Sequence, residues 1–249
     1  MIANTLQNKR LILLGIVTLL FTLLMSIILC EGVYLPWNEA ILHMARTLQS
    51  PLLTNIFLPI TYLGESKILL IASVFITLYC LSQKHWRLAL YWFFYLLGLS
   101  ASISLVKHGI HTPRPGGIVS SPAGYSFPSG HVTLAVAFYG FWIFRIAHAL
   151  HPRFFMPLLS GFAVFVVLVA MSRLYLSAHW LTDVLGSALL GTILLTLVNI
   201  LYERKTVDNI KPFMTTAVCL LSLIICTTIY GVKHFEIDKQ NVQLVALDL

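Results

Sequence analysis

The sequence predicts an all-α protein, a bundle of helices that crosses a membrane several times. Apolar residues make up 58% of the 249 positions and charged residues only 10%, and the mean hydropathy is +0.87. Soluble domains carry about 25% charged residues, so this composition excludes a soluble globule. Without a repeat, low-complexity segment or linker to divide it, the chain is expected to form one integral membrane domain over residues 1–249. Its core would be 11–201, and 202–249 would be an extra span and tail.

Seven apolar runs are candidate membrane spans, because each is long enough, or nearly so, to cross about 30 Å of hydrocarbon. They cover residues 11–29, 66–81, 88–106, 131–150, 157–176, 181–201 and 213–232. The first run is longer than the core of a secretion signal and no small-x-small cleavage site follows it, so we expect an uncleaved helix. The second is the shortest, and gains length from residues 58–63 if its helix starts earlier.

Residues 35–64, between the first two runs, are too polar to cross a membrane and too apolar for a free loop. Asn38 is expected to cap one short helix and Pro51 to open another. The apolar face of the first would consist of Ile41, Met44, Ala45 and Leu48. Two placements remain open: the stretch lies along the outer membrane interface, or it packs on the bundle.

The last run, 213–232, is apolar throughout and carries no charge, which favours a seventh span over a re-entrant or peripheral segment. Residues 233–249 would then form a short polar tail on the outer side.

The loops on the two sides of this predicted bundle carry unequal numbers of cations, nine against seven. The nine are Lys9, Arg10, Lys84, Arg87, Arg145, Arg153, Arg204, Lys205 and Lys211. The side richer in Lys and Arg is cytoplasmic by the positive-inside rule. The N-terminus is therefore expected inside, and the polar motifs described next are expected outside.

Charge and cysteine content exclude further classes. The net charge of +7 does not predict a nucleic-acid partner, because the Lys and Arg residues occur in ones and twos between apolar runs. The four cysteines have no ligand neighbour at metal-binding spacing, so they are expected to be small apolar residues without a structural disulfide. They are Cys30, Cys80, Cys219 and Cys226.

Three polar clusters interrupt the apolar sequence where predicted helices end or begin. Residues 107–115 contain K-x6-R-P, residues 125–131 end in P-S-G-H, and residues 172–183 read S-R-x5-H-x3-D. Ionisable side chains at membrane depth are costly, so such clusters are functional candidates by default.

The clusters bring three permanent cations, two histidines and one carboxylate to one side of the predicted bundle, a set that suits a tetrahedral oxyanion. Cations neutralise phosphate charge, and a helix start offers unpaired backbone N–H groups and a hydroxyl donor. The predicted phosphate-binding residues are Lys107, Arg114, Ser129, Gly130 and Arg173.

His179 and Asp183 are four residues apart, so on a helix they share one face. The carboxylate can accept the Nδ1 proton and leave Nε2 free. We therefore expect His179 to be the nucleophile, forming a phosphohistidine that water hydrolyses, and His131 to be the general acid on the leaving oxygen. Two-metal sites need several carboxylates, yet only Asp183 of the nine acidic residues lies in the motifs. No metal or other cofactor is expected.

In this order and spacing, the three motifs resemble the signature of the type 2 phosphatidic acid phosphatase (PAP2) superfamily, which also includes vanadium haloperoxidases. The resemblance covers residues 11–201, implies a six-helix core, and agrees with the roles given above. It implies a lipid phosphatase in the cell (inner) membrane whose site faces outward. Its substrate would be phosphatidic acid, phosphatidylglycerol phosphate, undecaprenyl pyrophosphate or a lipid A phosphate, selected by residues 35–64 and 116–127.

Three other functions stay open. A phosphotransferase would pass phosphate from undecaprenyl pyrophosphate to another lipid through the same phosphohistidine. A haloperoxidase would be soluble, which seven apolar runs disfavour, and a non-catalytic membrane scaffold would have lost a motif residue, whereas none is lost. The expected partners are the lipid substrate and membrane lipids, without nucleic acid.

Overall fold

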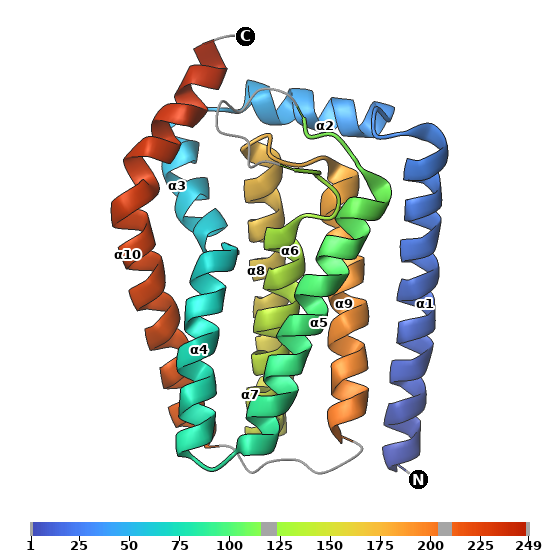
Figure 1. Ribbon diagram of the computed structural model, residues 1–249, viewed down its shortest axis with the longest axis vertical. Coiled ribbons are helices and arrows are strands. Elements are labelled where there is room, and N and C mark those ends of the chain that lie inside the picture. Colours follow the sequence, from blue (N-terminus) through green and yellow to red (C-terminus); the bar gives the residue numbers. More distant parts are fainter. Residues whose placement is uncertain (1, 116–123, 204–210, 248–249) are drawn as a thin grey trace.

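The computed structural model describes residues 2–115, 124–203 and 211–247, and within these ranges every regular element is a helix. The helices stand side by side as one upright bundle, and α2 (Pro36–Thr47) lies across its upper end (Figure 1). The N-terminus lies at the lower end and the C-terminus at the upper end. The predicted all-α transmembrane bundle is confirmed.

Among the described residues, six helical stretches are long and apolar enough to cross a membrane. Five are single helices, namely α1 (Ile2–Glu31), α5 (Trp86–Ile110), α8 (Phe155–Tyr175), α9 (Leu181–Glu203) and α10 (Pro212–Leu247). The sixth is continuous through α6 (Gly130–Leu134), the π-helical turn η1 (Ala135–Tyr139) and α7 (Gly140–Ala149). A 3-10 turn, η2 (Pro152–Phe154), leads on to α8.

The remaining predicted span is broken. The helices α3 (Pro51–Tyr62) and α4 (Ser66–Ser82) pass the length and hydropathy test together, with a 40° bend between them. Helix α3 therefore runs on into α4 and does not lie along the interface, whereas α2 does lie across the bundle (Figure 1). Pro51 opens α3 as expected, with the Ser50 side chain accepting a hydrogen bond from Leu53 N.

The capping role expected of Asn38 is wrong. Helix α2 begins at Pro36, whose fixed φ suits a first helical position, so Leu35 is its N-cap. Asn38 is buried inside α2 and serves another helix: its Oδ1 accepts from Thr182 N at 3.1 Å, and its Nδ2 donates to Thr182 Oγ1 at 3.0 Å. These bonds fix α2 over the first turn of α9.

The polar tail expected over residues 233–249 is helical where the structure describes it, because α10 continues to Leu247. Its 36 residues extend about 54 Å. Tyr62 Oη donates to Asp238 Oδ2 at 2.7 Å, and Val242 is buried against Leu58 of α3 and Tyr175 of α8. Phe235 and Val242 are seven residues apart, so they share the helix face that packs on α3.

An aromatic core holds the two helices that carry the first two motifs. Trp92 of α5 is fully buried, and its ring centroid lies 5.2 Å from that of Phe138, 5.0 Å from Phe141 and 5.2 Å from Trp142. These contacts fix the first half of α5 against η1 and the start of α7. All four cysteine thiols are free.

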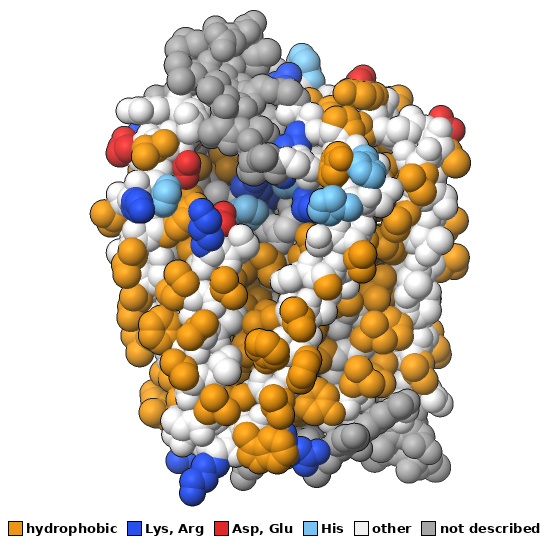
Figure 2. Space-filling model, viewed as in Figure 1, with side chains coloured by type: hydrophobic (Ala, Val, Ile, Leu, Met, Phe, Trp, Pro, Cys, Tyr) orange, Lys and Arg blue, Asp and Glu red, His pale blue; other side chains and the backbone are white. Residues whose placement is uncertain are grey.

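Charged and histidine side chains gather around the upper end of the molecule, other cations mark the lower end, and mostly hydrophobic side chains lie between (Figure 2). This distribution is the one expected of a chain that crosses a bilayer. Two cations of the orientation argument, Arg204 and Lys205, and most of the expected substrate-selecting segment 116–127 lie outside the described residues.

Candidate active site

The three polar motifs meet at the upper end of the bundle. The first occupies the last turn of α5 and the segment after it, the second leads into α6, and the third runs from the last turn of α8 into α9. Both later motifs bind the backbone of the first: Ser126 N donates to Thr112 O, and Trp180 Nε1 donates to Pro113 O, each at 2.8 Å. The fold therefore brings the three motifs together, as the sequence predicted.

His179 and Asp183 make the expected contact, but not on one helix face: His179 precedes α9, which begins at Leu181, and Asp183 lies in its first turn. Nδ1 of His179 lies 3.2 Å from Oδ2 of Asp183. The carboxylate is fully buried and also accepts from Trp180 N at 2.9 Å and from Ser126 Oγ at 3.3 Å. These donors fix its position, so the Asp183 carboxylate in turn fixes the orientation of the imidazole ring.

The other ring nitrogen, Nε2 of His179, points toward a cation. It lies 3.4 Å from Nη1 of Arg114. Burial holds the pKa of His179 well below its ordinary value, and the nearby cations Arg173, Arg114 and Lys107 lower it further. The ring is therefore neutral near pH 7, which is the state that a nucleophilic imidazole requires.

Three cations surround this imidazole, and neutral oxygens hold each of them. Arg114 Nη1 donates to Ala178 O at 3.0 Å, and Lys107 Nζ donates to Tyr125 O at 2.7 Å. Arg173, which is buried, donates from Nη1 to Thr61 Oγ1 at 2.7 Å. Since these acceptors are neutral, they orient the cations without cancelling their charge, which stays available to an anion.

Ser129 and Gly130 stand at the start of α6, as predicted. Ser129 is the N-cap residue, and its Oγ is a buried atom without a hydrogen-bond partner. A buried hydroxyl left unpaired costs about 1–3 kcal/mol, so this atom is a candidate ligand-binding donor. The first N–H groups of α6 lie beside it and have no partner within the helix.

His131 faces a residue to which the sequence analysis gave no role. Its Nε2 lies 3.2 Å from Oε2 of Glu65, the N-cap residue of α4. Gly64 makes this approach possible, because a Cβ at that position would lie 3.0 Å from Cβ of His131. The bend between α3 and α4 thus brings a carboxylate to the histidine of the second motif.

All eight predicted site residues lie at this end of the bundle, and the contacts of six of them form two groups. Hydrogen bonds join Lys107, Arg114, His179 and Asp183 directly or through Tyr125 O. His131 and Arg173 are instead tied to the α3–α4 bend, through Glu65 and Thr61.

Sequence reasoning missed Glu65, Thr61 and Ser126. One signal was available for Glu65, since an acidic residue at the start of a membrane helix is costly and therefore a functional candidate. Thr61 and Ser126 are ordinary polar residues, and only their tertiary contacts distinguish them.

In the ranges that the structure covers, no three His, Cys, Asp or Glu side chains are grouped so that they could hold a metal ion. Activity without a metal remains a prediction.

Comparisons with known proteins agree with the motifs. Residues 112–207 match the model of the PAP2 superfamily. The phosphatidylglycerophosphatase B of Bacillus subtilis (strain 168) is 32% identical over 168 residues, which is 65% of this chain and 81% of that protein. The crystal structure of a transmembrane PAP2-type phosphatidylglycerolphosphate phosphatase from Bacillus subtilis superposes with a TM-score of 0.70 at 28% identity, covering 78% of this chain and 97% of that one. This chain therefore belongs to the PAP2 superfamily and is a membrane lipid phosphatase.

Proposed function

We propose that the chain hydrolyses the terminal phosphate of a membrane lipid at the extracytoplasmic face, without a metal, through a phosphohistidine on His179. The observation that carries this proposal is the position of the His179 ring. Asp183 lies 3.2 Å from Nδ1, and Nε2 is directed toward the guanidinium of Arg114.

In the first step, the Nε2 lone pair of His179 attacks phosphorus and the bond from phosphorus to the lipid oxygen breaks. His131 donates a proton to that oxygen, which leaves as the lipid alcohol. Asp183 stabilises the positive charge that develops on the imidazole.

In the second step, water attacks phosphorus and the bond from phosphorus to Nε2 breaks. His131, now deprotonated, accepts a proton from the water, so both histidines return to their starting states.

The phosphate-binding residues would be Lys107, Arg114 and Arg173, with Ser129 Oγ and the backbone N–H groups from Gly130 onward. Three cations around one phosphate are suited to the charge of a trigonal bipyramidal transition state. Because their present partners are neutral oxygens, phosphate binding would not have to break a salt bridge to reach them.

Phosphatidylglycerol phosphate is the first substrate to test, because the curated relative and the solved neighbour carry that activity in their names. Phosphatidic acid, undecaprenyl pyrophosphate and lipid A phosphates belong to the same chemical class. An outward-facing site in the cell (inner) membrane is supported by the distribution of Lys and Arg between the loops. A reporter enzyme fused after Leu249 tests this orientation, since the proposal requires activity of the reporter outside the cytoplasm.

The direct test is phosphate release by purified protein in detergent with excess chelator, for each lipid in turn. We expect release from at least one lipid, inhibition by vanadate, and loss of release in His179→Ala. Release that requires an added divalent ion, or that persists in His179→Ala, would contradict the proposal. Lipid-dependent transfer of phosphate to a second lipid, without release, would identify a phosphotransferase instead.

A further inference from the structure

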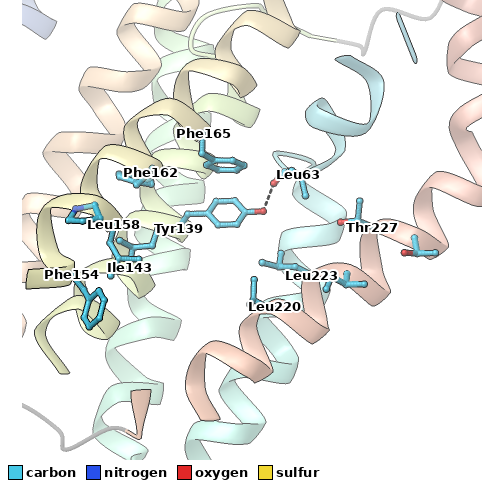
Figure 3. Close-up of a pocket in the computed structure, with 14 residues that line it drawn as sticks. Leu63, Tyr139, Ile143, Phe154, Leu158, Phe162, Phe165, Leu220, Leu223 and Thr227 are labelled. Atoms are coloured by element: carbon cyan, nitrogen blue, oxygen red, sulfur yellow. Dashed lines mark hydrogen bonds between the residues drawn. The ribbon is translucent and has the colours of Figure 1, made fainter. Parts of the chain in front are cut away.

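A large apolar groove lies between α8 and α10 and has no part in the proposed chemistry. Its volume is about 730 Å³, within the range of small-molecule sites. Aromatic side chains of α8 and η2 form one wall and aliphatic side chains of α10 form the other (Figure 3). Residues that line it include Phe154, Leu158, Phe162, Phe165, Leu220 and Leu223.

The groove faces the membrane interior. Ile224, which lines it, has 60% of its surface exposed, and Leu220 has 53%. Both side chains lie in the part of α10 that is long and apolar enough to cross a bilayer. In that position hydrocarbon chains are the surrounding solvent, so a hydrocarbon chain is the occupant that fits the groove.

The upper end of the groove adjoins the active site. Leu63 lines it, and Tyr139 Oη donates to Leu63 O at 2.7 Å (Figure 3). Leu63 directly precedes Gly64 and Glu65, the two residues in contact with His131. The same backbone segment therefore borders the groove and holds the histidine of the second motif.

The length of the groove matches a position beneath a bound headgroup. Its lining on the α8 side extends from Phe154 to Phe165, which is about 16 Å along a helix. Arg173 is eight residues beyond Phe165 on the same helix, or about 12 Å higher. A lipid with its phosphate near Arg173 would have its chains at the depth of the groove.

We propose that this groove binds a hydrocarbon chain of the lipid substrate while the phosphate occupies the site formed by His179, Arg114 and Arg173. The inference rests on the proposed lipid phosphatase function and adds a site for the tail. Because the family match ends at residue 207, the wall formed by α10 is a feature of this chain beyond the matched region.

Gly161 provides the test, because it lines the groove and a Cβ built on it meets nothing within 4 Å. Gly161→Leu should fill the groove without displacing protein atoms. The matched control is Gly98→Leu. Gly98 lines a second apolar groove, of about 380 Å³ between α5 and α9, and its Cβ position is equally open.

The two variants are compared on dioleoyl and dihexanoyl phosphatidic acid in detergent. We expect Gly161→Leu to raise KM for the dioleoyl lipid roughly three- to tenfold. The effect is modest because an acyl chain excluded from the groove stays in the apolar detergent and loses only its packing contacts with the protein. Its KM for the dihexanoyl lipid and both KM values of Gly98→Leu should stay at wild type. Equal effects on both chain lengths, equal effects of both variants, or no effect of Gly161→Leu would overturn the proposal.

A binding measurement separates this inference from the proposed reaction. His179→Ala in phosphatidylcholine vesicles is exposed to phosphatidic acid with a diazirine near the end of one acyl chain, irradiated and digested. Labelling within 157–165 and 220–228 is expected, with competition by unlabelled dioleoyl phosphatidic acid and loss in the Gly161→Leu background. Labelling elsewhere, or equal competition by phosphatidylcholine, would overturn the proposal. If the wild-type protein releases no phosphate from any lipid, the proposed function fails, and the labelling still shows whether the groove binds an acyl chain.

Discussion

Glu65 Oε2 lies 3.2 Å from His131 Nε2, so the first turn of α4 holds the histidine at the first turn of α6. Glu65 is itself held, since its Oε1 accepts from Ser66 Oγ at 3.1 Å and from Lys67 N at 3.4 Å. A fixed carboxylate beside a proposed general acid orients the imidazole ring.

Glu65→Gln is therefore expected to lower kcat on a lipid phosphate about 10- to 100-fold, with little change in KM. This loss is part of the rate enhancement that general acid catalysis supplies. The activity of the variant on p-nitrophenyl phosphate, whose leaving group needs little protonation, should fall much less. Steady-state kinetics on both substrates checks this, with Glu39→Gln, an exposed acid of α2, as control. Equal losses on the two substrates would mean that Glu65 does not act through His131.

Asp183→Asn should reduce kcat by about 10³- to 10⁴-fold, because an amide in place of the carboxylate favours the wrong imidazole tautomer. Trp180 N donates to Oδ2 and Ser126 Oγ to Oδ1, and an amide has only one acceptor oxygen, so one of these bonds is lost and the Tm should fall without loss of the fold. Phosphate release and thermal unfolding in detergent are measured on the same preparation. A rate near wild type would show that the contact between His179 and Asp183 is not used.

The pKa of His179 lies below its ordinary value, so its ring should take up a proton only when the pH falls below about 6.5. NMR of protein with ¹³C-labelled histidine can follow this titration, with the signal assigned by its loss in His179→Ala. Arg173→Gln should move the midpoint upward, because a cation that opposes protonation is removed. A midpoint at or above 6.5 in the wild type would contradict this account of the site's electrostatics.

Gly186→Ala should destabilise the protein, because a Cβ on Gly186 would overlap the ring of Phe127. Phe127 is fully buried and directly precedes Pro128 of the second motif, so a displaced ring would also disturb Ser129. Overpacking of this kind costs about 1–3 kcal/mol. Thermal unfolding should show a lower Tm than wild type, whereas Gly15→Ala, whose Cβ meets nothing within 4 Å, serves as control. An unchanged Tm for Gly186→Ala would mean that the Phe127 ring moves away from α9 at little cost.

The sequence was most informative where chemistry is encoded in short spacing. His179 and Asp183 are four residues apart, and their spacing predicted the contact, although His179 lies two residues before α9 and Asp183 in its first turn. The apolar runs were equally direct, because the bilayer sets the minimum length of a span.

Contacts between segments that are distant in the sequence could not be predicted from spacing. Glu65 meets His131, and Thr61 meets Arg173 across 112 residues, only because α3 and α4 bend at Gly64. Asn38 looked like a cap for its own helix and instead caps α9 through Thr182. Residues 233–247 looked like a polar tail because their partners are distant in the sequence. Asp238 binds Tyr62, and Val242 packs on Leu58.

The central claim is that His179 carries the phosphoryl group during turnover. It is tested most directly by mixing the protein with phosphatidic acid labelled with ³²P in the phosphate, quenching in alkali, where phosphohistidine survives, and mapping the label by digestion and mass spectrometry. We expect transient label on His179 and no label in His179→Ala. Turnover with no label on His179 at any time, or label on another residue, would contradict it.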